Sequence, residues 1–454
     1  MIPLSREKFQ DALEKGLGRA VQHVRVSRPE EVRDDLLNVS LHCLVFDAQC
    51  EGWRAPWLME MFQITGETEF YRKPILERLD EISDTELRKG RDFWQLYHFA
   101  KEFALRGDKE AHESVYRAFD RMIHDNFIEG SEELIELDGI AGLVYILEKT
   151  GQRIRDGFGF CNAKYDIESA EEKFGKETVQ NAIETAKKQN EFVRLYFERA
   201  AMKDPYFDGP FVYRERLPDL SLREWTDQIM DEDFSDFEIG DEDHPFLSLD
   251  MRRRIFVRVA RKAETAELEY AFEKLMQTDN PMRQYCLLGI FAKRPMPRVE
   301  KKILDLIDSE NVSLTWYAAQ ALSSTSHEWI REKGLELLQS DPPQSNWYSG
   351  IELLENSFRP GDQRMIEKAL VKNVFPDIHS LHGAGLSLKH LIGSNPQESF
   401  ADCCLWFYDQ TPCSLCREDF VKHLVEKASA PPELLEECRD DCSEETRELV
   451  SAKE

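Results

Sequence analysis

The chain has 454 residues, too many for one ordinary compact core, so several domains or one extended array are expected. Its 59 lysines and arginines against 87 aspartates and glutamates give a formal net charge of −28, which argues against general binding to nucleic acid because phosphate backbones are repelled. Hydrophobic residues make up 41% and aromatic residues 11%, enough to build folded cores, which excludes a wholly disordered acidic chain.

The N-terminal stretch MIPLSREKFQDALEKG is charged and lacks the apolar core of a signal peptide. No later stretch reaches the roughly 18 uncharged apolar residues that would span a bilayer. Ten cysteines at scattered spacings fit reduced thiols better than a disulfide scaffold. We therefore expect a cytoplasmic protein that does not bind membranes.

Residues 1–203 contain apolar helical patterns in pairs without a constant period, which predicts irregular helical hairpins. In one of them a polar start at Gly130 precedes an apolar run, and Gly151 is placed to end the helix, since glycine commonly follows a helix C-terminus. Residues 204–250 then hold several helix breakers and the acidic run MDEDFSDFEIGDEDHP. Breakers beside like charges predict an acidic loop or linker there.

A 31-residue repeat marks the region from 251 to 450. Four apolar helical stretches start one period apart, at Arg254, Tyr285, Trp316 and Trp347. Partner helices keep the same spacing, marked by Leu275, Leu306 and Leu337. A period of this size predicts stacked helix pairs in which each pair covers the apolar face of its neighbour. The predicted fold class is therefore all-α, an alpha-solenoid of stacked antiparallel helix pairs entered from irregular helical hairpins at the N-terminus.

Aligned columns support the repeat. In the first helix of successive units Phe256, Leu287, Ala318 and Ser349 align, and in the second helix Met276, Ile307 and Leu338 align. This pattern resembles the short HEAT-like repeats of the armadillo and HEAT superfamily, including the phycobilisome-lyase type, over residues 249–372 and more loosely through the C-terminus. The resemblance implies a helical solenoid and carries no catalytic residue. The phosphate-loop, HExxH and GxSxG motifs are all missing from the sequence, so no catalytic residue is predicted.

The candidate metal ligands are four C-terminal cysteines, Cys413, Cys416, Cys438 and Cys442. Their CxxC and CxxxC spacings could hold a structural zinc ion through four thiolates, at about 2.3 Å each. The alternative is that these residues are buried or surface thiols, because cysteine commonly packs as a small hydrophobe. His379 and His382 precede Gly383 and Gly385, and we interpret them as turn histidines. No other cofactor is expected.

Two sets of residues are candidate partner contacts. Arg254, Arg258 and Arg261 share one face of the helical stretch MRRRIFVRVARK and could bind an acidic or phosphorylated segment. Alternatively they pair with nearby acids. The second set is two aromatic pairs one repeat apart, Trp316 with Tyr317 and Trp347 with Tyr348. These could grip a peptide, or they could pack between adjacent units.

The predicted function is a non-enzymatic protein-binding scaffold or adaptor that uses a solenoid surface, with a partner that is basic or has a basic patch. One alternative is an enzyme or nucleic-acid-handling protein on a HEAT-like frame, for which the stretch from Arg252 to Lys262 would supply a local basic channel. Another alternative is an acidic decoy that occupies a nucleic-acid-binding protein.

Overall fold

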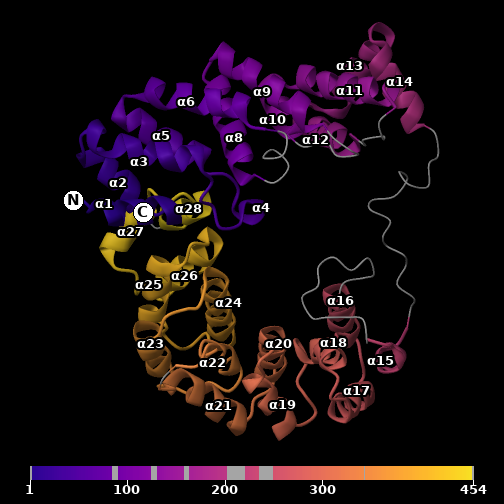
Figure 1. Cartoon of the computed structure of the whole chain (residues 1–454), viewed down its shortest axis with the longest axis vertical. Helices are drawn as coiled ribbons and strands as arrows, with labels where there is room; N and C mark the ends of the chain where they lie inside the picture. The colour runs from indigo at the N-terminus through magenta and orange to yellow at the C-terminus, as the bar shows by residue number, and fades with distance from the viewer. Residues whose placement is uncertain are drawn as a thin grey trace. The chain divides into compact units, whose positions relative to one another are not determined.

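The computed structural model describes residues 3–83, 90–123, 130–157, 163–201, 220–234, 249–341 and 343–451. These residues form helices and contain no β-strand, which confirms the predicted all-α class (Figure 1). None of the described helices is long and apolar enough to cross a membrane. The chain divides into two compact units: unit 1 comprises Met1–Arg214 and Leu435–Ser451, and unit 2 comprises Glu215–Leu434 with Ala452–Glu454.

Unit 1 is built from consecutive helices with an aromatic core. Its helices are α1 (Arg6–Lys15), α2 (Arg19–Val26), α3 (Pro29–Leu41), α4 (Ala48–Glu51), α5 (Ala55–Thr65), α6 (Thr68–Glu81), α8 (Arg91–Leu105), α9 (Lys109–Met122), α10 (Ser131–Asp138), α11 (Ile140–Arg155), α12 (Lys164–Phe174), α13 (Lys176–Gln189), α14 (Glu191–Ala200) and α28 (Glu444–Ser451). The Phe62 ring stacks on Tyr71 of α6 at 4.0 Å and on Phe99 of α8 at 5.5 Å. These contacts join α5, α6 and α8 around one core.

The last described segment of the chain packs against the first helices of unit 1. Arg19 bonds Glu437 at 2.6 Å, Arg25 makes a two-pronged ion pair with Asp440, and the indole N–H of Trp57 donates to the Asp440 carbonyl at 2.9 Å. The predicted boundary of the repeat region at residue 450 is therefore too late, since Leu435–Ser451 belongs to unit 1. Charged pairs between residues about 400 positions apart leave no periodic signal in the sequence.

Unit 2 contains the 31-residue repeat. Its helices are α15 (Leu222–Asp231), α16 (Leu249–Ala260), α17 (Thr265–Gln277), α18 (Pro281–Phe291), α19 (Lys301–Asp305) with the 3-10 turn η1 (Leu306–Asp308), α20 (Val312–Ser323), α21 (Glu328–Gln339), α22 (Ser349–Leu353), α23 (Gln363–Lys372), α24 (Ile378–Ser394), α25 (Ala401–Gln410) and α26 (Ser414–Glu426), while α27 (Pro432–Cys438) crosses the boundary to unit 1. Helices α16, α18, α20, α22, α24 and α26 contact one another in that order. The aligned residues Phe256, Leu287 and Ala318 are all buried in one continuous core.

The acidic segment predicted as a loop contains a helix. Much of it, residues 204–219 and 235–248, lies outside the described residues, but Leu222–Asp231 forms α15. The Ser221 side chain accepts from the Glu224 amide, and the Glu224 carboxylate accepts from the Ser221 amide, which is a capping box. Ile229 is buried in the core of unit 2. The prediction was wrong here because breakers and like charges on both sides outweighed a ten-residue helical signal.

Gly151 does not end its helix, contrary to the prediction. It lies inside α11, which continues to Arg155. A Cβ atom at this position would overlap the backbone carbonyl of Phe192 in α14. The glycine is therefore a point of close backbone approach between α11 and α14, a role that glycine fills because it has no side chain.

Candidate functional site

Unit 1 contains a cavity of about 720 Å³. Three short segments line it: residues around α4, the exposed side of α8, and the first turn of α10. The lining side chains that matter here are Asp47, Trp53, Arg91, Trp94, His98, Glu132 and Glu133. Arg91, Trp94 and His98 stand at positions i, i+3 and i+7 of α8, so one helix face presents all three to the cavity.

Aromatic rings form part of the cavity wall. The Trp53 ring stacks on the His98 imidazole with centroids 5.2 Å apart and lies 6.3 Å from the Trp94 ring, at interplanar angles of 25° and 26°. Indole faces carry negative electrostatic potential and attract cations. This part of the wall therefore suits a positively charged group attached to an apolar chain.

Beside the rings, Glu133 and His98 form a mostly buried pair. The Nε2 atom of His98 lies 3.4 Å from a carboxylate oxygen of Glu133. Burial, aided by the charge of Lys101, lowers the pKa of His98 to about 3, so the imidazole is neutral at pH 7. Burial also raises the pKa of Glu133, because a desolvated carboxylate is penalised. The charge of Lys101 acts against this rise, and a cation entering the cavity would favour the ionised carboxylate further.

The other charged groups leave the cavity acidic. The Arg91 guanidinium donates to the backbone carbonyls of Val45 at 2.7 Å and Phe46 at 3.1 Å, so it is hydrogen-bonded to the backbone and not to the carboxylates that line the cavity. Glu132 is within 3.6 Å of Lys173, and Asp47 adds a further carboxylate. Sequence reasoning missed this site because its residues come from three separate segments and match no motif. The arrangement fits the side chain of a lysine or arginine, or another cationic amine.

Arg254 and Arg258 lie exposed on α16, and Arg261 lies exposed just beyond the end of that helix at Ala260. Their neighbours are engaged elsewhere: Arg252 pairs with Glu232, and the Arg253 guanidinium lies 4.2 Å from the ring centre of Tyr317. Arg254, Arg258 and Arg261 make no ion pair with another residue of the described ranges. Most of the acidic run that precedes these arginines lies outside the described residues, so partner binding and internal pairing both stay predictions.

The aromatic pairs divide into packing residues and accessible ones. Trp347 is only 1% exposed, and its indole N–H donates to the Val374 carbonyl at 3.3 Å. Tyr317 is buried between Arg253 and Tyr285, whose ring it meets edge-on at 4.6 Å. Burial favours the packing alternative for both of these residues. Trp316, 38% exposed, and the half-buried Tyr348 stay accessible.

The four predicted zinc ligands do not belong to one unit. Cys413 and Cys416 lie at the start of α26 in unit 2, whereas Cys438 at the end of α27 and Cys442 belong to unit 1. In the described part of the chain, the group of possible ligands that contains the CxxC pair includes neither Cys438 nor Cys442. His382 joins that pair. It is helical, since α24 runs from Ile378 to Ser394, so its interpretation as a turn histidine is also wrong.

No protein-family model, curated protein or solved structure matches the chain. Evidence for function comes from the chemistry of the residues themselves.

Proposed function

We propose that this protein is a cytoplasmic, non-enzymatic scaffold that binds a protein with a basic patch. In this proposal the repeats of unit 2 form a HEAT-like solenoid of stacked antiparallel helix pairs. The observation that carries the proposal is the cavity of unit 1, where Trp53, Trp94 and the mostly buried Glu133 line one space. Indole faces and a carboxylate together recognise a cationic side chain.

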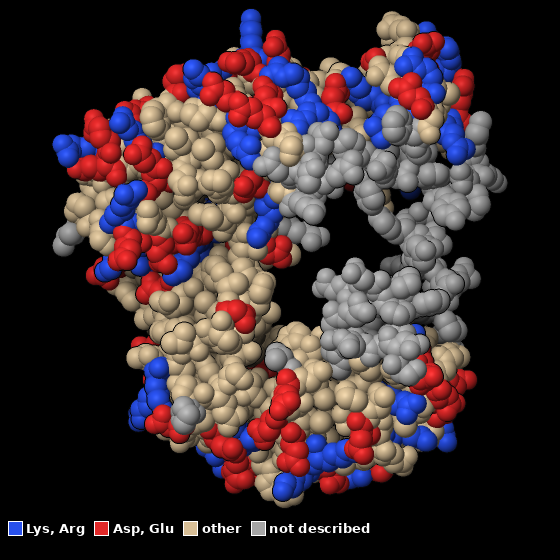
Figure 2. All heavy atoms as spheres, in the orientation of Figure 1, with Lys and Arg blue, Asp and Glu red and all other residues tan. Residues whose placement is uncertain are grey.

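Unit 2 supports the scaffold part of the proposal. Consecutive first helices of the repeat contact their neighbours from α16 to α26, as expected for helical arrays that hold other macromolecules. Charged side chains crowd the visible surface of α19 and α21, whereas that of α24 to α26 is mostly uncharged (Figure 2). Ile378 on α24 and Leu415 on α26 are exposed apolar residues. This surface can add apolar contacts to electrostatic attraction.

Binding of a basic partner is expected to weaken as salt rises. Raising the salt from about 0.1 M to about 1 M shortens the screening length from about 10 Å to about 3 Å, which removes long-range attraction to a chain of net charge −28. The measurement is affinity capture from native lysate over a salt series, with mass spectrometry of the retained proteins. A partner retained equally at all salt concentrations would refute the basic-partner proposal.

A gel shift with single- and double-stranded DNA at low salt separates the alternatives. The scaffold predicts no shift. A shift that disappears when the arginines of α16 are replaced would instead support the nucleic-acid-handling alternative. A captured partner that itself binds DNA or RNA at the surface facing this protein would support the decoy.

Replacing Arg254, Arg258 and Arg261 by glutamine (R254Q/R258Q/R261Q) is expected to weaken capture of a partner that carries an acidic or phosphorylated segment. The loss should be about tenfold, because charge-assisted hydrogen bonds contribute about 1.5 kcal/mol or more. The matched control is K8Q/K176Q/K188Q, which removes three exposed cations from unit 1 and so causes the same change in net charge. If both triple variants capture the partner equally, the three arginines have no specific role in binding and are ordinary solvent-exposed residues.

A further inference from the structure

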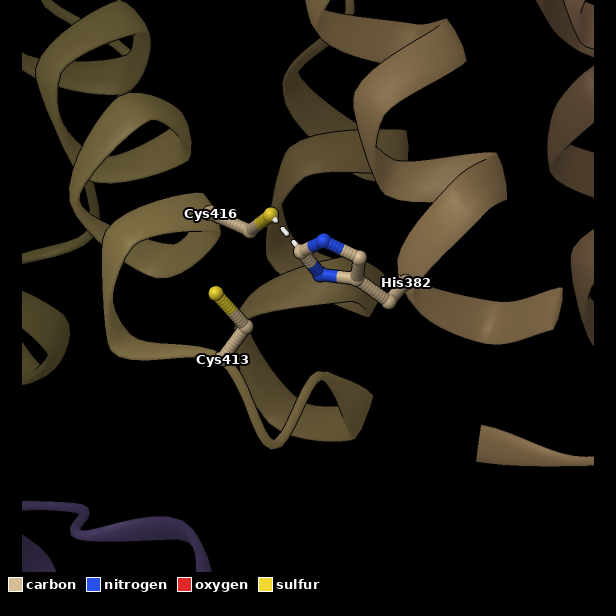
Figure 3. A group of neighbouring side chains, drawn as sticks. All are labelled: His382, Cys413 and Cys416. Atoms are coloured by element: carbon tan, nitrogen blue, oxygen red, sulfur yellow. Dashed lines mark hydrogen bonds between the residues drawn. The ribbon is translucent and has the colours of Figure 1, made fainter. Parts of the chain in front are cut away.

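His382, Cys413 and Cys416 converge in unit 2 (Figure 3). The Sγ atom of Cys416 lies 3.4 Å from Nδ1 of His382. One donor atom from each of the three residues lies within 4.8 Å of the other two. Both cysteines are buried, and His382 is partly exposed, so the group can be reached from solution through the imidazole.

Two neighbouring helices build this group. His382 lies in the second turn of α24, Cys413 is the N-cap residue of α26, and Cys416 is the third residue of that helix. The CxxC spacing across a helix start turns both sulfur atoms to the same side, which is why it commonly forms half of a zinc site. His382 stands 31 residues before Cys413, one period of the repeat.

The spacing of the donor atoms agrees with a tetrahedral ion. Zinc bonds of about 2.3 Å to sulfur and about 2.0–2.1 Å to nitrogen place the two ligand atoms about 3.6 Å apart. The observed separation between Sγ of Cys416 and Nδ1 of His382 is 3.4 Å. Thiolate and imidazole are ligands that select zinc over magnesium or calcium, which prefer oxygen.

Cys413 and Cys416 would bind the ion as thiolates, so a divalent ion would replace the thiol protons on binding.

A second group of metal-ligating residues, Glu352, Glu355 and His390, also occurs in unit 2. Its carboxylates are accounted for without an ion. Glu355 accepts hydrogen bonds from the hydroxyls of Ser323 at 3.1 Å and Ser394 at 3.3 Å.

We propose that His382, Cys413 and Cys416 bind one zinc ion in unit 2, with water in the fourth position. Within the described part of the chain the group has three members, and three protein ligands with one open position are typical of zinc sites that react or exchange ligands. The proposal is independent of the scaffold function: zinc binding can fail while partner capture persists, and the reverse holds too.

The test is a titration of the full-length protein, freed of metal with a chelator, with Co²⁺ alone. The expected result is one Co²⁺ per chain, with a thiolate-to-cobalt charge-transfer band and the strong visible bands of a tetrahedral ion, both abolished by added Zn²⁺. C413S/C416S should lose the charge-transfer band. H382A should weaken binding about 100-fold or more, because changes even to residues that only orient a ligand cost about 10- to 100-fold.

The matched control is C403S/C404S, which changes two buried cysteines of α25 that lie outside the group and should bind Co²⁺ as the wild type does. Circular dichroism of each metal-free variant shows whether it folds. If C413S/C416S does not fold, H382A still tests the proposal. An unmodified protein that gives no charge-transfer band overturns the proposal. So does H382A with unchanged affinity, because the imidazole would then be only a hydrogen-bond partner of Cys416.

Discussion

Replacing Glu132 and Glu133 by glutamine (E132Q/E133Q) is expected to weaken capture of the basic partner about 30-fold. The Glu133 carboxylate is mostly buried beside Trp53 and His98. In the proposed complex it would form a buried charge pair with a cation of the partner, and removing one member of such a pair costs about 2 kcal/mol or more. The measurement is the dissociation constant of the partner recovered by affinity capture, determined by titration calorimetry.

The double variant should fold as well as the wild type. Because burial raises the pKa of Glu133 in the folded state, ionising this residue costs folding free energy at pH values above its unfolded pKa. A neutral glutamine removes that cost, so the melting temperature at pH 7 should be unchanged or higher. The cost vanishes below the unfolded pKa, where the carboxyl is protonated in both states.

The matched control for charge is E172Q/E177Q, which neutralises two exposed acids of α12 and α13 in the same unit. It should weaken capture little, because exposed charges contribute mainly through screened long-range attraction. If both double variants weaken capture equally, the cavity has no special role and only net charge matters. Trp94→Leu then provides a second check, since loss of the indole face should reduce affinity without changing the charge.

Replacing Gly151 by alanine (G151A) is expected to destabilise unit 1 by about 3 kcal/mol. The added Cβ would overlap the Phe192 carbonyl, so α11 and α14 must move apart at their point of closest approach. Thermal unfolding should show the loss, and hydrogen exchange should speed up in Ile140–Arg155 and Glu191–Ala200.

The control for this effect is G393A in α24, where an added Cβ meets nothing within 4 Å. Alanine is favoured over glycine inside a helix, so G393A should stabilise the protein by about 0.5–1 kcal/mol. If G151A were as stable as the wild type, the two backbones could not approach each other as the structure has them.

The sequence by itself determined the helical class and the core of the repeat. Apolar residues that recur along a helix, and again 31 residues later, define which side chains must be buried, as Phe256, Leu287 and Ala318 are. The capping box of Ser221 and Glu224 is also a local signal, but it lies in the segment that was predicted to be a loop. These properties depend on residues close in sequence or on a constant period, so the amino-acid order reveals them.

The sequence also identified some site residues while leaving their partners open. The CxxC pair stood out by its spacing, and the shared face of Arg254 and Arg258 on α16 followed from helical geometry. The role of Trp347 did not follow from the sequence, because an aromatic residue at a repeat position can either pack between adjacent units or contact a partner. Only its burial decided between them.

Tertiary structure decided which distant residues meet. It brought His382 to Cys413 and Cys416, assigned Leu435–Ser451 to unit 1, and gathered Trp53, Trp94 and Glu133 around one cavity. It also turned Gly151 from an expected helix end into a contact point between two helices. Such contacts depend on how helices pack across long stretches of chain, and no local propensity or spacing encodes that packing.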